Sequence, residues 1–133
     1  MFIKLTNDET DKVKNIIETL DQAFENWFNG ISDINEFSSI SNHLADEWIF
    51  INNQTPNIIN SKNDFITMAP LFHGKHKNNP VKFSHDIKEQ RKLCNNKVLL
   101  TYFEIISTKD ETTSKPITMI INLDNLKVEY IHE

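Results

Sequence analysis

The chain has 133 residues, of which 38% are hydrophobic and 25% are charged, and its formal net charge is -5 at pH 7. This length and composition predict one globular domain with a real core and exclude a disordered chain. The acidic balance disfavours a general nucleic-acid-binding protein, because phosphate backbones repel an acidic surface.

Cysteine content and hydropathy favour a soluble cytoplasmic protein. Cys94 is the only cysteine, so no internal disulfide forms. The first residues carry no long apolar run of the kind found in a signal peptide. No segment approaches the ~20 apolar residues of a membrane-spanning helix. We therefore expect a cytoplasmic location and no membrane association.

Apolar residues recur at spacings of three and four over residues 13–28, which is the period of one buried helical face. We expect a helix that is capped by Asn7 or Thr10 and ends before Gly30, which suits the left-handed position after a helix. The polar side chains of this helix are expected to contact water: Lys12, Lys14, Asn15, Glu18, Asp21, Gln22 and Glu25.

The next segment predicts short elements. A second helix is expected from Ile34 to His43, and the β-branched and aromatic run at 48–51 predicts a strand. A turn cluster at 52–57 and a short partner strand follow. Ser61 and an acidic residue three positions later resemble a capping box, which predicts a short helix up to Pro70.

Everything after Pro80 predicts long antiparallel strands. Alternation from Val81 places Phe83, His85 and Ile87 on one face. Residues 97–107 are apolar on both faces and predict a central strand. A charged loop at 109–115 and a final hairpin over 116–122 and 126–132 complete the chain. We expect an α+β fold, in which N-terminal helices pack in the concavity of a curved, mostly antiparallel sheet, as in a cone-like, cystatin-like roll.

Three segments carry a family resemblance: Leu44-Ala45-Asp46-Glu47-Trp48-Ile49-Phe50, the short helix at 61–65, and the closing strand at 126–132. With the order of elements, they resemble the nuclear transport factor 2-like (NTF2-like) superfamily, particularly its SnoaL-like and ketosteroid-isomerase-like small bacterial members. The resemblance covers nearly the whole chain as a single domain, 1–133. It implies an α+β cone that holds a ligand in some members and forms a dimer through its sheet in many.

The chain departs from the ketosteroid isomerases at three positions that the resemblance marks as catalytic. Their aspartate base falls near Asn52, and an amide does not accept a proton as a carboxylate does. Their tyrosine on the first helix is matched by Phe24 and Phe28, which lack a hydroxyl. Their protonated aspartate falls near Ile117. We therefore do not expect ketosteroid isomerisation.

Three polar residues of the predicted sheet form a candidate catalytic group. His85 shares a strand face with apolar neighbours, and the same alternation continues into Glu89 and Arg91. Tyr102 and Glu104 alternate with apolar residues on the next strand. If that face lines the cone, an imidazole beside a desolvated carboxylate is suited to moving protons. Alternatively, His85 and Glu104 are satisfied polar groups at a rim, or Glu104 faces solvent.

Several large apolar side chains are candidates for lining a hydrophobic pocket, although a plain core requires the same residue types. We predict the ligand-binding set to be Phe24, Phe28, Trp48, Phe50, Phe83 and Met119. The loop residues His73 and His76 have a spacing seen in metal sites, but structural zinc takes four ligands. We therefore predict no metal and no cofactor, and we interpret Cys94 as an incidental thiol.

Two functions remain open from the sequence, besides that of a metal-dependent enzyme that would use the loop residues His73 and His76. In the first, a hydrophobic pocket binds a small apolar molecule, with or without turnover. In the second, the chain is a non-catalytic homodimerisation module whose cavity is filled by side chains. The second depends on an apolar outer face of the sheet, because exposed apolar patches usually mark interfaces. The residues predicted on that face are Leu99, Thr101, Phe103 and Ile105.

Overall fold

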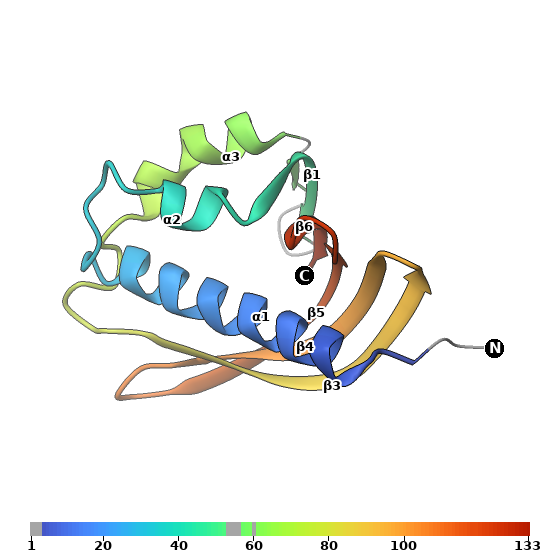
Figure 1. The fold of residues 1–133 in the computed structure, drawn as a ribbon. Coiled ribbons are helices and arrows are strands. Elements are labelled where there is room, and N and C mark those ends of the chain that lie inside the picture. The colour runs from blue at the N-terminus through green and yellow to red at the C-terminus, as the bar shows by residue number, and fades with distance from the viewer. Residues whose placement is uncertain (1–3, 53–56, 60) are drawn as a thin grey trace.

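The computed structural model describes residues 4–52, 57–59 and 61–133. Helix α1 lies in the concave side of a curled sheet, and α2 and α3 lie on the other side of α1 from β3 (Figure 1). The elements are α1 Asn7–Phe28, α2 Ser38–Ser41, β1 Leu44–Asn52, β2 Asn57–Ile59, α3 Lys62–Met68, the 3-10 helix η1 Ala69–Phe72, β3 Lys82–Cys94, β4 Lys97–Ser107, β5 Thr112–Asn122 and β6 Lys127–His132.

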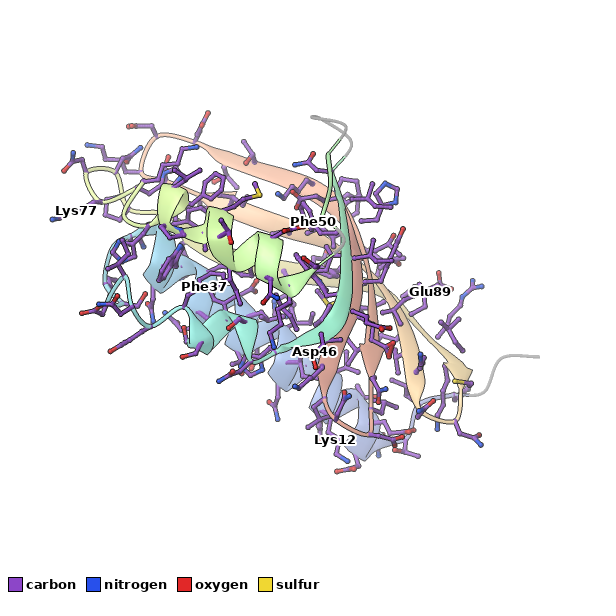
Figure 2. The ribbon with its side chains drawn as sticks, turned by 90° about the horizontal axis from the view of Figure 1, so that it is seen from above. Lys12, Phe37, Asp46, Phe50, Lys77 and Glu89 are labelled. Carbon is purple, nitrogen blue, oxygen red and sulfur yellow. The ribbon has the colours of Figure 1, made fainter. Side chains whose placement is uncertain are left out.

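The described strands form one sheet in the order β2-β1-β6-β5-β4-β3. Among the described strands, β1 and β6 pair in parallel, and the other neighbours are antiparallel. The predicted α+β class, with helices in the concavity of a mostly antiparallel sheet, is confirmed. Seen from above, the labelled Lys77 and Glu89 lie at opposite ends of the molecule (Figure 2). No helix within the described ranges is long and apolar enough to cross a membrane.

The start of α1 differs from the prediction. Thr6, rather than Asn7 or Thr10, caps the helix, because the extended backbone of Thr6 lets its hydroxyl accept a hydrogen bond from the Glu9 amide. The Glu9 carboxylate accepts in return from the Thr6 amide, which completes a capping box. The end of the helix is as predicted, because Gly30 has a φ of 72°.

The second helix is much shorter than predicted. Residues 33–36 form a turn, in which the Asp33 carboxylate accepts a hydrogen bond from the Asn35 amide at 2.8 Å. That turn competes with helix formation, so α2 begins only at Ser38. Phe37 packs instead against Trp27, with ring centroids 4.9 Å apart.

Strand boundaries also shift where pairing extends a strand into polar sequence. β1 begins at Leu44, which pairs with Val128 of β6, rather than at residue 48. β5 begins at Thr112 within the predicted charged loop, because Thr112 pairs with Ser107 of β4. The short partner strand β2 is present, and the short helix α3 begins after Ser61 as predicted. Residues 53–56 of the predicted turn lie outside the described residues.

A bulge in β3 reverses the alternation that the sequence suggests. The register with β4 shifts between Ile87 and Glu89. An extra residue moves later side chains to the opposite face. The expectation that Glu89 and Arg91 share a face with His85 is therefore wrong. Past the bulge it is Lys92 that turns toward α1, where its Nζ lies 2.8 Å from a Glu9 carboxylate oxygen.

The core forms between α1 and the concave face of the sheet. Val13, Ile17 and Leu20 of α1 pack with Leu100 and Met119 of the sheet, and all five side chains are almost fully buried. A second cluster surrounds Trp27, whose indole N–H donates to the Ala69 carbonyl oxygen at 3.0 Å. The two clusters attach α1 to both the sheet and η1.

Candidate ligand-binding pocket

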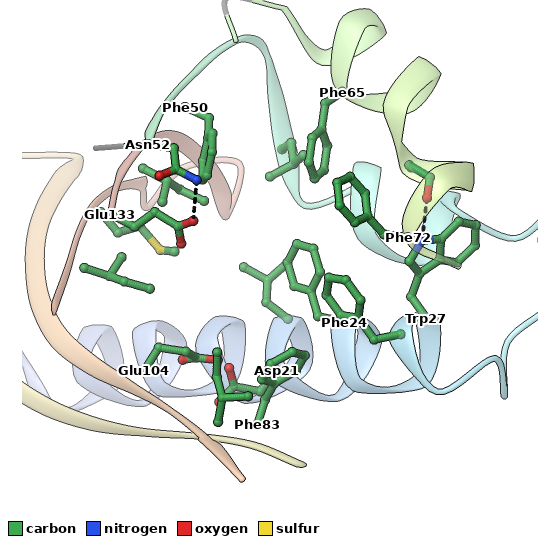
Figure 3. Close-up of a pocket in the computed structure, with 18 of the residues that line it drawn as sticks. Asp21, Phe24, Trp27, Phe50, Asn52, Phe65, Phe72, Phe83, Glu104 and Glu133 are labelled. Carbon is green, nitrogen blue, oxygen red and sulfur yellow. Dashed lines mark hydrogen bonds between the residues drawn. The ribbon is translucent and has the colours of Figure 1, made fainter. Parts of the chain in front are cut away.

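A pocket of about 430 Å³ lies between α1, α3 and the concave face of the sheet (Figure 3). Its walls are mostly apolar and strongly aromatic. The aromatic residues that line it are Phe24, Trp27, Phe28, Phe37, Trp48, Phe50, Phe65, Phe72, Phe83 and Tyr102. All six residues of the predicted ligand-binding set, Met119 included, are among the lining residues. Their role in binding stays a prediction.

The aromatic walls come from three layers of the fold and contact one another. Phe24 of α1 stacks on Phe28 and meets Phe65 of α3 edge-on, with centroids 6.3 and 6.5 Å away. Phe65 also packs against Trp48 of β1 at 4.8 Å. Aromatic pairs in these offset and edge geometries are favourable beyond their buried area. The contacts therefore support the pocket from helix to sheet.

A carboxyl pair lies at one end of the pocket, where α1 crosses β4. Glu104 is only 9% exposed, and the carboxyl group of Asp21 lies within hydrogen-bonding reach of its own. Figure 3 shows the two side chains next to each other. The buried Oε2 atom of Glu104 receives no hydrogen bond from a donor among the described residues. Two carboxyl groups this close share a proton more readily than both ionise.

The pKa values follow from this arrangement. Burial, the hydrogen bond with Asp21 and the negative charge of Asp21 together raise the pKa of Glu104 from 4.5 to about 9, against a smaller lowering by the charge of Lys115. Burial and the charges of Glu104 and Asp21 also raise the pKa of Tyr102 well above its ordinary value. At neutral pH, Glu104 is therefore a neutral acid and Tyr102 a neutral phenol.

His85 lies on the helix-facing side of β3 but is not among the residues that line the pocket. Its Nδ1 is 2.7 Å from Oδ2 of Asp21, and both side chains are largely buried. A carboxylate oxygen accepts, so Nδ1 donates the hydrogen bond. His85 is also the register partner of Glu104, and its ring centroid is 6.5 Å from that of Tyr102. The three predicted catalytic residues are thus neighbours, linked through Asp21.

Sequence reasoning missed Asp21 and placed it in water. The structure buries it, with a side chain 13% exposed. A usable pattern was present, because Asp21 lies four residues after Ile17 and three before Phe24, in the same helical stripe. An acid within an apolar stripe predicts a buried polar contact. Glu25 is similar, because its carboxylate accepts a hydrogen bond from the Phe83 amide at 2.9 Å.

A second polar group adjoins the carboxyl pair, because Lys115 of β5 is the register partner of Glu104. Lys115 Nζ is 2.7 Å from a carboxylate oxygen of Glu133. The Asn52 amide donates to the other carboxylate oxygen of Glu133 at 3.4 Å (Figure 3). Asn52 and Ile117, which the resemblance aligns with catalytic aspartates, both line the pocket. These positions therefore reach the pocket but offer an amide and an alkyl side chain.

The loop histidines have structural partners. His73 Nε2 is 2.6 Å from the Ser32 carbonyl oxygen, and its ring packs edge-on against Trp27. His76 packs against Phe28 at 6.0 Å and lines the pocket. In the part of the chain that the structure describes, no group of three His, Cys, Asp or Glu side chains is placed to hold a metal ion. Cys94 is exposed.

The outer face of β4 is half-exposed. Leu99, Thr101, Phe103 and Ile105 alternate with the buried residues Val98, Leu100, Tyr102 and Glu104. Phe103 is 38% exposed, and Lys88 Nζ lies 5.9 Å from the centre of its ring.

Solved structures share this fold along nearly the whole chain. An NTF2-like protein of unknown function from Pseudomonas putida has a TM-score of 0.72 and 12% identity, over 97% of this chain and 87% of that one. A cystatin-like protein of unknown function from Nostoc punctiforme has a TM-score of 0.70 and 6% identity, over 98% and 92%. An LEH-like epoxide hydrolase from M. tuberculosis has a TM-score of 0.55 and 12% identity, over 92% and 80%.

No protein-family model and no curated protein matches the sequence. The structural likeness at these low identities establishes the fold. The chain has the same α+β fold as these NTF2-like and cystatin-like proteins, as its order of elements predicts.

Proposed function

We propose that this protein binds a small, largely apolar molecule in the pocket between α1 and the sheet. One observation supports the proposal above the others, namely a pocket of about 430 Å³ with mostly aromatic and aliphatic walls and a small number of polar groups. Ligand sites in proteins have this volume range and this distribution of polar groups. A domain whose cavity is filled by its own side chains would not retain such a space.

The carboxyl pair extends the proposal to acid–base chemistry on the bound molecule. Glu104 holds a proton at neutral pH, and Asp21 accepts a hydrogen bond from His85. A neutral acid beside a carboxylate is the combination that donates and accepts protons within one site. Tyr102 contributes a protonated phenol near the pair. In this proposal Glu104, Tyr102 and His85, which acts through Asp21, keep the roles that the sequence suggests.

A fluorescent dye tests binding directly. N-phenyl-1-naphthylamine is small, apolar and uncharged at neutral pH, and its emission rises when it leaves water. We expect saturable binding with a micromolar Kd. Ile117→Trp fills the pocket and is expected to abolish the rise, whereas Thr118→Trp places the same ring on the other face of β5 and is the matched control. Equal binding by both folded variants would place the dye elsewhere and reject the proposal.

A second candidate function is homodimerisation through the outer face of the sheet. The half-exposed apolar row on β4, with Phe103 at its centre, favours it. It is compatible with ligand binding, because the row and the pocket lie on opposite faces of the sheet. Sedimentation equilibrium tests it, and a monomer at millimolar concentration would reject it.

A further inference from the structure

We infer that the molecule bound in the pocket carries a protonated amine on an apolar body, and that the amine contacts the carboxyl pair of Asp21 and Glu104. The inference rests on the proposed binding function and names the chemical class of the ligand. It is argued from the charges, the hydrogen-bonding groups and the aromatic walls of the pocket.

The charges that line the pocket are unbalanced. Among the described residues, three that line the pocket are acids, Asp21, Glu104 and Glu133, and one is a lysine, Lys115. That lysine is already paired with Glu133 at 2.7 Å. No lysine or arginine of the described ranges forms an ion pair with Asp21 or Glu104, and the contact of Asp21 is with His85. Lys115 is the register partner of Glu104, and its charge lowers the pKa of Glu104, but its Nζ is paired with Glu133. No lysine or arginine of the described ranges therefore contacts the carboxyl pair directly, and a cationic ligand group would supply that contact.

The hydrogen-bonding groups of the pair point to a donor-rich ligand. Oε2 of Glu104 is buried without a donor, and its side chain is more than nine-tenths buried. Even when one proton is shared between the two groups, most of their oxygen lone pairs remain acceptors. An ammonium group carries three donors and no acceptor. Charge-assisted hydrogen bonds of this kind are about twice as strong as neutral ones.

The walls of the pocket suit both the amine and the apolar body of such a ligand. Phe24 and Phe83 line the pocket near Asp21 (Figure 3), and the face of an aromatic ring attracts a cation within about 6 Å. Trp48 and Phe50 stack at 5.7 Å on β1 and offer an apolar surface for the body of the ligand. A neutral ligand would leave the negative charge of the pair unmatched, and an anionic ligand would be repelled.

Three probes with the same apolar body distinguish a preference for a cationic ligand from one for a neutral or an anionic ligand. 3-Phenylpropylamine, 3-phenylpropanol and 3-phenylpropanoate share an apolar body and differ in the charge and the hydrogen-bonding atoms of the head group. Each is titrated at pH 8 against the bound N-phenyl-1-naphthylamine. We expect the amine to bind at least tenfold more tightly than the alcohol and the carboxylate to bind most weakly. An alcohol or a carboxylate that binds as tightly as the amine overturns the inference and leaves the binding function intact. If no probe and no dye binds, the binding function fails as well.

Substitutions test whether the amine contacts Asp21 and Glu104. The double substitution Asp21→Asn and Glu104→Gln removes the charge of the pair. We expect it to lower the affinity for the amine about tenfold and to change the affinity for the alcohol less than threefold. Asp86→Asn is the matched control, because Asp86 lies on β3 next to His85 but is half-exposed and paired with Lys88. An equal loss for amine and alcohol overturns the assigned contact. If the double variant does not fold, Asp21→Asn alone is compared with Asp86→Asn in the same way.

Discussion

Replacing Glu104 by glutamine is expected to stabilise the protein at neutral pH. The wild-type chain must keep this buried carboxyl group protonated, because its pKa is raised from 4.5 to about 9 in the folded state. The unfolded chain releases that proton near pH 4.5. The stability that the proton provides is therefore fully present below pH 4.5 and is lost progressively as the pH rises through 9. Glutamine is neutral at every pH and avoids this loss.

The size of the effect follows from the pKa difference. Each pKa unit corresponds to about 1.4 kcal/mol, so the wild-type protein loses at most about 3 kcal/mol relative to Glu104→Gln between pH 5 and pH 7. Relaxation of the site reduces this, and we expect about 1–3 kcal/mol. This difference in the free energy of unfolding exceeds the few tenths of a kcal/mol expected for the substitution of an exposed residue.

Urea unfolding, followed by tryptophan fluorescence at pH 5, 7 and 9, measures the effect. The exposed residue Glu47 on β1 supplies the control variant Glu47→Gln. The free energy of unfolding of Glu104→Gln should exceed that of the wild type by a margin that grows with pH, whereas Glu47→Gln should run parallel to the wild type. A constant or negative margin for Glu104→Gln would refute the shared-proton arrangement at Asp21 and Glu104.

Three further substitutions test the elements that support the pocket. Thr6→Ala removes the cap of α1 and is expected to lower the free energy of unfolding by about 1 kcal/mol in urea titrations, whereas an unchanged midpoint would contradict the cap. Asn29→Ala breaks two hydrogen bonds to the backbone of Val81, at 2.9 and 2.8 Å, and should cost about 1–3 kcal/mol by the same assay; a smaller loss would mean that water replaces them. Phe103→Asp should convert a dimer to a monomer in sedimentation experiments without weakening dye binding, and a persisting dimer would exclude the outer face of β4.

The sequence predicts the main features of this fold because they depend on periodicity. The apolar stripe of α1 and the alternation of β3 up to Ile87 both survive in the structure. Strand ends were less predictable, because β5 extends into polar sequence only where β4 offers a partner. The bulge after Ile87 has no local sequence signature, so the face of Glu89 could not be deduced from alternation.

The apolar residues that line the pocket could be predicted from the sequence, but the carboxyl pair could not. Aromatic residues on inward faces line the pocket, since burial and pocket lining require the same side chains. The pairing of Asp21 with Glu104 depends on where α1 crosses β4, a tertiary contact between residues far apart in the chain. His85 was expected at the pocket, but the helix approaches so closely that Asp21 lies in between.

Occupation of the pocket is measured most directly at the methionine methyl groups that line it. Met68 and Met119 both line the pocket, from α3 and β5. In protein labelled with carbon-13 at its methionine methyl groups, bound N-phenyl-1-naphthylamine should show nuclear Overhauser effects to both methyl groups, with shifts that saturate together. Saturating dye that leaves both methyl resonances unmoved, without a nuclear Overhauser effect, would contradict a small molecule bound between α1 and the sheet.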